Sequence, residues 1–137
     1  MNNRFISLIK LSAVLILLSS LFFGCSRTRG PEAKLRSALV YMKAENWEEY
    51  SKCYKNTRDG EKCATDWQKI LERKGGIKSF KISRIDMPDI NTMASISYKI
   101  NYKDGTSDKD LRAVLVPIKN GRWGILREVP VFGGYRR

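Results

Sequence analysis

The most informative feature of the sequence is a change of hydrophobic period at Gly75-Gly76. Before this pair, apolar residues recur at intervals of three and four, as on one face of a helix. From Ile77 onward they alternate with polar residues, as in half-buried strands. Glycine readily adopts the left-handed conformation at a helix end, so the pair is a stop signal. The order predicts an α+β protein in which helices precede the sheet.

Three helices are predicted ahead of the glycine pair. The first begins at Pro31, since proline suits the first helical position, and runs to about residue 44. Asn46-Trp47-Glu48-Glu49 resembles a capping box and predicts a second helix over 46–55. We expect one stripe of this helix to carry Trp47, Tyr50 and Tyr54.

Asp59-Gly60 is predicted to interrupt the chain before a third helix, from about Glu61 to Lys74. Its apolar face is expected to present Cys63, Trp67, Ile70 and Leu71.

Four strands are predicted after the glycine pair. The first contains Phe80 and Ile82 and ends in a turn at Pro88-Asp89, and the second is the clearest alternation, over 94–102. The third covers 111–118. Asn120-Gly121 is a strong hairpin signal leading into a last strand with Trp123, Ile125 and Val129. Pro117 cannot donate to a ladder, so it is expected at an edge or bulge.

The helix pair, the late sheet and the closing segment Asn120–Ile125 resemble the NTF2-like (cystatin-like) α+β fold. The nearest resemblance is to small exported lipoproteins that carry a domain of uncharacterised function. The resemblance implies helices packed on a curved four-stranded antiparallel sheet, often around a conical cavity. The expected lining of that cavity is Trp47, Trp67, Tyr98, Tyr102 and Trp123.

The amino terminus predicts export. Residues 1–10 contain Arg4 and Lys10 and no acid, and residues 11–23 are uncharged. An uncharged run of this length spans roughly 20 Å as a helix, short of a bilayer core of about 30 Å. A signal peptide therefore fits better than a permanent transmembrane helix.

Leu21-Phe22-Phe23-Gly24-Cys25 resembles the lipobox of bacterial prolipoproteins, although Phe22 and Phe23 depart from its commoner residues. The resemblance implies cleavage between Gly24 and Cys25, and attachment of lipid to the Cys25 thiol. Residues 1–24 would be the signal peptide, 25–30 a lipidated tether, 31–129 the domain and 130–137 a tail. An ordinary signal peptide or an uncleaved anchor with an incidental cysteine is the alternative. Lipidation predicts a membrane location, and Ser26 favours the outer membrane where the cell has one.

Cys53 and Cys63 are separated by ten positions, and in an oxidising compartment they could form a disulfide bond. The alternative is two buried thiols on apolar helix faces. Two cysteines without histidine make a poor zinc set, so neither a metal nor another cofactor is expected.

The formal net charge of +12 favours anionic partners such as lipid head groups, an anionic envelope component or an acidic protein. A solvated basic surface is the alternative. A basic sheet face that could contact nucleic acid would comprise Lys99, Lys103, Arg112, Arg122 and Arg127. No nucleic-acid motif accompanies these residues, and export would separate them from such partners, so no nucleic acid is expected.

Catalysis is not expected from the sequence. Histidine is absent, which excludes His-dependent triads. The remaining carboxylates considered lie in two turn regions, at Asp86 and Asp89 and at Asp104, Asp108 and Asp110. The prediction is a membrane-anchored, non-catalytic binding or accessory module of the cell envelope. The alternatives are a cavity enzyme with a Tyr/Asp acid–base pair and a basic nucleic-acid or anion-binding protein.

Overall fold

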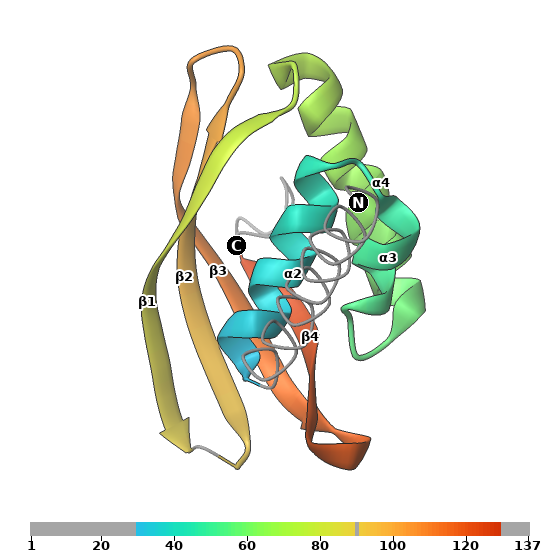
Figure 1. Ribbon diagram of the computed structural model, residues 1–137, viewed down its shortest axis with the longest axis vertical. Helices are drawn as coiled ribbons and strands as arrows, with labels where there is room; N and C mark the ends of the chain where they lie inside the picture. The colour runs from blue at the N-terminus through green and yellow to red at the C-terminus, as the bar shows by residue number, and fades with distance from the viewer. Residues whose placement is uncertain (1–29, 90, 130–137) are drawn as a thin grey trace, which may run out of the picture.

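The computed structural model describes residues 30–89 and 91–129, which form three α-helices followed by a four-stranded sheet (Figure 1). The helices are α2 (Pro31–Lys43), α3 (Trp47–Lys52) and α4 (Thr57–Lys74). The strands are β1 (Ile77–Asp89), β2 (Met93–Tyr102), β3 (Ser107–Ile118) and β4 (Arg122–Val129), with the 3₁₀ turn η2 (Lys119–Gly121) between the last two. The predicted α+β class is confirmed.

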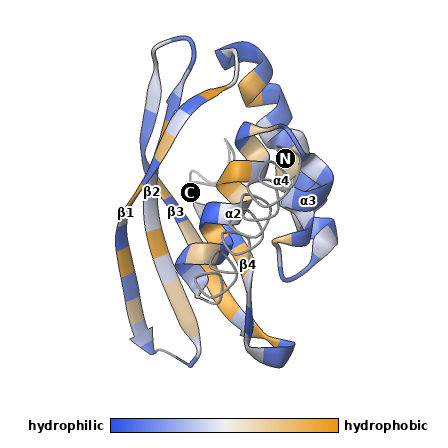
Figure 2. Cartoon of the chain, in the orientation of Figure 1, coloured by the Kyte–Doolittle hydropathy of each residue, from blue (hydrophilic) through white to orange (hydrophobic). Residues whose placement is uncertain are grey.

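The sheet is an antiparallel meander in the order β1-β2-β3-β4, so each strand pairs with its neighbour in the chain. It curves around α2, with α3 and α4 lying beyond that helix (Figure 1). Polar and apolar residues alternate along the strands (Figure 2), as expected for a sheet with one face buried. None of the helices that the structure describes is long and apolar enough to cross a membrane.

The core lies between α2, α4 and the concave face of the sheet. Helix α2 buries Leu35, Ala38, Leu39 and Met42 at helical spacing. Strand β2 buries every second residue from Ala94 to Tyr102, the alternation that predicted it. Gly75, at φ +78°, ends α4 in the left-handed conformation, as predicted. Asn120 and Gly121, at φ +66° and +67°, lie in the predicted β3–β4 turn, but Ile118 pairs with Arg122, so the turn has three residues rather than two.

Helix α3 ends three residues earlier than predicted because the following segment joins the sheet. The Asn46 side chain accepts a hydrogen bond from the Glu49 amide at 3.4 Å, so the predicted cap forms at the helix start. Beyond Lys52, the Ile125 amide donates to the Cys53 carbonyl at 2.9 Å, and the Lys55 amide donates to the Ile125 carbonyl at 2.8 Å. These bonds cover the edge of β4, which would otherwise be open to pairing with another chain.

The predicted chain break at Asp59-Gly60 is wrong. Helix α4 begins at Thr57, capped by the Asn56 side chain, and Gly60 is buried inside it. A Cβ atom at Gly60 would lie 2.5 Å from the Ser51 carbonyl oxygen. The glycine therefore permits the close approach of α3 and α4, a role that its sequence neighbours do not reveal.

The predictions made for the two prolines in strands, Pro88 and Pro117, agree with the structure to different degrees. The predicted turn at Pro88-Asp89 begins later than expected, because β1 continues through Asp89, whose carbonyl then accepts a hydrogen bond from the Thr92 amide at 3.2 Å. Strand β1 is an edge strand, where a missing amide is tolerated. Pro117 pairs with Trp123 of β4, beyond the Leu115–Ala94 pair where contact with β2 ends, so its predicted edge position is confirmed.

Candidate functional site

A β-bulge in β4 determines which side chain enters the centre of the core. Leu115 pairs with Ile125 and Val114 pairs with Arg127, so Leu126 is an extra residue on β4. Leu126 and Arg127 are both exposed, whereas Glu128 is only 4% exposed. Strict alternation would have placed Arg127, not Glu128, on the same face as Ile125. The sequence prediction therefore missed Glu128.

The Glu128 carboxyl is the centre of a buried polar cluster. Trp67 Nε1 donates to its Oε2 at 2.8 Å, and the Tyr50 hydroxyl donates to its Oε1 at 3.3 Å. The Tyr50 and Tyr54 hydroxyls lie 3.1 Å apart and share a hydrogen bond. Four elements, α3, α4, the α3–α4 connection and β4, thus converge on one carboxyl group. We call Glu128, Trp67, Tyr50, Tyr54 and Tyr98 the Glu128 cluster.

Burial raises the pKa of Glu128 to about 7, because the charged form loses its hydration. The indole and tyrosine hydroxyl groups around the carboxyl act in the opposite direction and favour the anion. Burial, and then the nearby Glu128 charge, raise the pKa values of Tyr50 and Tyr98. The tyrosines therefore stay neutral at neutral pH, while the Glu128 carboxyl is near its midpoint.

Tyr98 differs from the other members of the cluster. Its hydroxyl is close enough to Glu128 to lower the pKa of the carboxyl, yet it does not reach hydrogen-bond geometry with any described group. The geometry is the stricter measure, so Tyr98 is best described as a neighbour of the carboxyl rather than as one of its hydrogen-bond donors.

A carboxyl near its midpoint beside hydroxyl groups has the chemistry of a proton donor or acceptor. Access decides whether it can act on a substrate. Glu128, Trp67, Tyr50 and Tyr98 are each 4% exposed or less. The cluster is therefore a sealed arrangement in this conformation.

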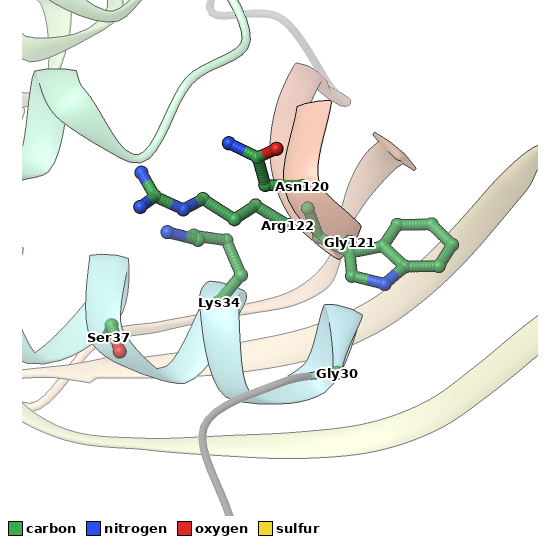
Figure 3. Close-up of a pocket in the computed structure, with 7 residues that line it drawn as sticks. Gly30, Lys34, Ser37, Asn120, Gly121 and Arg122 are labelled. Carbon is green, nitrogen blue, oxygen red and sulfur yellow. The ribbon is translucent and has the colours of Figure 1, made fainter. Parts of the chain in front are cut away.

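In contrast to the buried Glu128 cluster, a pocket of about 630 Å³ is open to solvent at the surface (Figure 3). It is formed where the start of α2 meets the β3–β4 turn, and we call it the hairpin pocket. Its lining is Gly30, Lys34, Ser37, Asn120, Gly121, Arg122 and Trp123. Lys34 and Arg122 supply two positive charges from separate elements.

A second pocket, of about 440 Å³, lies between α3 and α4. Trp47 lines it, together with Glu48, Ser51, Lys52, Thr57, Glu61, Ala64, Thr65 and Gln68. Its charged groups are of both signs, and Lys52 pairs with Glu48 at 3.2 Å and with Glu49 at 2.8 Å.

The five aromatic residues expected to line one cavity are separated in the structure. Trp67, Tyr98 and Tyr102 are packed in the core, whereas Trp47 and Trp123 line the two different surface pockets. The side chains that fill the interior of the sheet take the place of a common cavity. Trp67, Tyr98 and Tyr102 lie on buried faces, as predicted. However, the five aromatic residues do not together line the cavity that the resemblance implied.

The carboxylates considered from the sequence make local contacts. Arg84 Nε donates to Asp86 at 2.9 Å, and the Tyr102 hydroxyl donates to Asp108 at 2.6 Å. Asp104 accepts hydrogen bonds from Thr106, which lower the pKa of its carboxyl. The Tyr102–Asp108 contact is a Tyr/Asp pair, but it lies at the β2–β3 turn, away from Glu128. Asp89 accepts from the Asn91 amide at 2.9 Å, and Asp110 is exposed on β3.

The basic residues considered as a nucleic-acid face are distributed over three strands or their ends. Arg112, Arg122, Arg127 and Lys103 are exposed, and Lys99 is half-buried. Among them, only Arg122 lines the hairpin pocket.

Cys53 and Cys63 are both free thiols in the structure, so the disulfide bond that the sequence left open is not formed. Cys53 Sγ points back to the Glu49 carbonyl at 3.5 Å, and Cys63 lies beside the Tyr54 hydroxyl. Burial raises the pKa of each thiol, which disfavours the reactive thiolate. Gly24 and Cys25, the predicted cleavage and lipid-attachment residues, lie outside the described residues. Within residues 30–89 and 91–129, no three acidic or cysteine residues gather as a metal site.

Comparisons with known proteins identify the fold class and no more. No family model and no curated protein matches the sequence. A solved structure from Catenulispora acidiphila matches with a TM-score of 0.52 at 12% identity, over 78% of this chain and 91% of that one. This likeness shows a shared fold. A protein from Campylobacter jejuni named as an NTF2-like transpeptidase matches with a TM-score of 0.42 at 14% identity, over 80% of this chain and 96% of that one.

The architecture itself, three helices packed on a curved four-stranded antiparallel sheet, is the one implied by the resemblance to NTF2-like proteins. The predicted fold is therefore confirmed at the level of its elements and their order.

Proposed function

We propose that this chain is a lipid-anchored bacterial lipoprotein whose NTF2-like domain is a non-catalytic binding or accessory module of the cell envelope. The observation that carries the proposal is the position of Cys25. It directly follows the uncharged run 11–23 and the small residue Gly24, and the first helix begins at Pro31. A cysteine directly after such a segment is positioned as an acylation site.

Lipidation would hold the domain at a membrane surface. One acyl chain binds a membrane marginally, whereas two or three chains, at about 0.8 kcal/mol per buried CH₂, anchor a protein stably. The segment from Cys25 to Gly30 can extend roughly 20 Å at most. The amino-terminal end of α2 would therefore lie close to the head groups, with an anionic envelope component or a protein partner within reach. Ser26 after the cysteine favours the outer membrane in a cell that has one.

The sealed Glu128 cluster supports a non-catalytic role. A catalytic carboxyl has to contact its substrate, and Glu128 is enclosed by its own hydrogen-bond donors. One observation favours the alternative of a cavity enzyme, namely the proximity of Tyr98 to this carboxyl. The alternative would need the core to open, whereas a binding role uses the surface as it stands.

Intact-mass analysis of the membrane-extracted full-length gene product tests the anchor. We expect the wild type to lack residues 1–24 and to carry the added mass of acyl chains. The Cys25→Ser variant should carry no such mass, because serine does not provide the thiol. A Cys53→Ser variant is the matched control and should keep the lipid. A wild type without lipid, or with residues 1–24 still attached, would overturn the proposal.

A further inference from the structure

The hairpin pocket places two cationic side chains together without an acidic partner. Lys34 comes from the first turns of α2, and Arg122 follows the left-handed turn at Asn120 and Gly121. Figure 3 shows their charged ends pointing in the same direction from the two sides of the pocket. Both side chains carry a positive charge, so an anion bound between them would be attracted to both.

The acids nearby are engaged elsewhere or absent from the pocket. Within the described chain, neither Lys34 nor Arg122 forms a salt bridge. Glu32 lies on the same helical turn as Lys34 but pairs with Arg36 at 3.0 Å, and it does not line the pocket. The lining residues include no aspartate or glutamate. The pocket therefore carries a net positive charge.

The neutral lining suits an oxyanion. The Asn120 side-chain amide is a neutral hydrogen-bond donor in the pocket, whereas the Ser37 hydroxyl already donates to the Ala33 carbonyl at 3.0 Å. Arginine pairs with phosphate or carboxylate oxygens through two parallel N–H groups, and lysine adds a compact point charge. The half-buried Trp123 ring also supplies an apolar wall, as in side chains that sit at membrane interfaces.

We propose that the hairpin pocket binds a phosphate group, with Arg122 and Lys34 as its two charged ligands. Gly30 lines the pocket and follows Cys25 by five positions in the sequence, so a short tether would join the pocket to the proposed anchor. This position makes an anionic phospholipid head group the source closest at hand. Only that choice of source rests on the proposed lipid anchor, while the phosphate chemistry rests on the pocket.

Isothermal titration calorimetry on the full-length protein in maltoside micelles tests the proposal. The titrants are mixed micelles with phosphatidylglycerol, mixed micelles with phosphatidylcholine, and inorganic phosphate. We expect saturable binding of phosphatidylglycerol and weaker binding of phosphatidylcholine, whose phosphate is offset by its choline.

Charge-matched variants separate the pocket from the general basic charge. Arg122→Gln and Lys34→Gln should each weaken phosphatidylglycerol binding about fivefold. Arg127→Gln on the same strand as Arg122, and Lys43→Gln on the same helix as Lys34, lose the same charge outside the pocket and should leave the affinity unchanged.

Each outcome is decisive. Equal losses for pocket and control variants, or no binding of any titrant, would overturn the proposal. Equally tight binding of inorganic phosphate would support the phosphate site and identify a free phosphate as the source. Failure of the mass test at Cys25 with retained binding at Arg122 would reject the anchor and leave the pocket assignment standing.

Discussion

The Glu128 cluster and the hairpin pocket are both polar, but they differ in how their charges are satisfied. In the cluster, Tyr50 from α3 and Trp67 from α4 donate hydrogen bonds to a single acid on β4 that is 4% exposed. In the pocket, two cations from different elements share an open space that no acid lines. The difference indicates that buried polar residues which hydrogen-bond to one another stabilise this fold. Polar residues left without a counter-charge at the surface are available to a ligand.

The comparison makes different predictions for the two regions. Changes in the cluster should alter stability and its pH dependence, with little effect on ligand binding at the pocket. Changes in the pocket should alter binding, with stability effects within about 0.5 kcal/mol, as is usual for exposed positions.

The largest effect is expected for Trp67→Phe. This variant removes the 2.8 Å hydrogen bond to Glu128 and leaves a small void in the core. We expect the unfolding free energy at pH 8 to fall by about 4 kcal/mol, from a lost bond to a charged group and a cavity term. Urea denaturation measures it. Trp47→Phe at a half-buried position is the control, with a loss below about 1 kcal/mol. Equal losses in the two variants would mean that the indole bond has no special role.

The next effect is the pH dependence that Glu128 contributes. Its pKa is about 7 in the folded protein, against an ordinary value of 4.5, so the folded state binds more protons between these values. The unfolding free energy should therefore decrease as pH rises from 4.5 to 7 and level off above it, by on the order of 3 kcal/mol. Glu128→Gln should remove this decrease.

Urea denaturation at half-unit pH steps gives the slope. The matched control is Glu72→Gln, an exposed glutamate on α4, which should keep the wild-type profile. A stability that rises with pH across this window in the wild type, or an unchanged slope in Glu128→Gln, would contradict the assignment of this proton to Glu128.

The smallest effect is expected for Tyr98→Phe. The Tyr98 hydroxyl is buried without hydrogen-bond geometry to any described group, so its removal deletes no bond. The change in unfolding free energy should stay within about 1 kcal/mol. Tyr50→Phe, which removes the 3.3 Å bond to Glu128, should be more destabilising, and the reverse order would show that Tyr98 is a true ligand of the carboxyl.

The sequence predicted the fold where local signals coincide with tertiary structure. The glycine stop at Gly75, the alternation in β2 and the Asn120-Gly121 turn are each encoded within a few residues. Gly60 was wrongly predicted to break the chain. A glycine is needed there because the residue lies against Ser51, which belongs to another helix. Such close approaches cannot be derived from the neighbouring sequence.

The Glu128 cluster and the hairpin pocket were only partly predicted, because each depends on contacts between residues far apart in the sequence. Trp67 and Tyr98 were expected in the interior, but the partner that joins them was missed. The Leu126 bulge depends on pairing with β3, and it reverses the faces of Arg127 and Glu128. An isolated glutamate ahead of the last apolar residue gives no sign of this reversal. Arg122 was recognised as basic, but its meeting with Lys34 depends on the packing of α2 against the hairpin.

The indole N–H signals of a ¹⁵N-labelled sample test the central claim most directly, because Trp67 lies in the cluster and Trp123 in the pocket. The full-length protein in maltoside micelles is titrated with phosphatidylglycerol, and Trp→Phe variants assign the signals. The account predicts that the Trp123 signal moves saturably while the Trp67 signal stays in place. Movement of Trp67 with Trp123 unchanged would place the ligand in the interior and contradict the account.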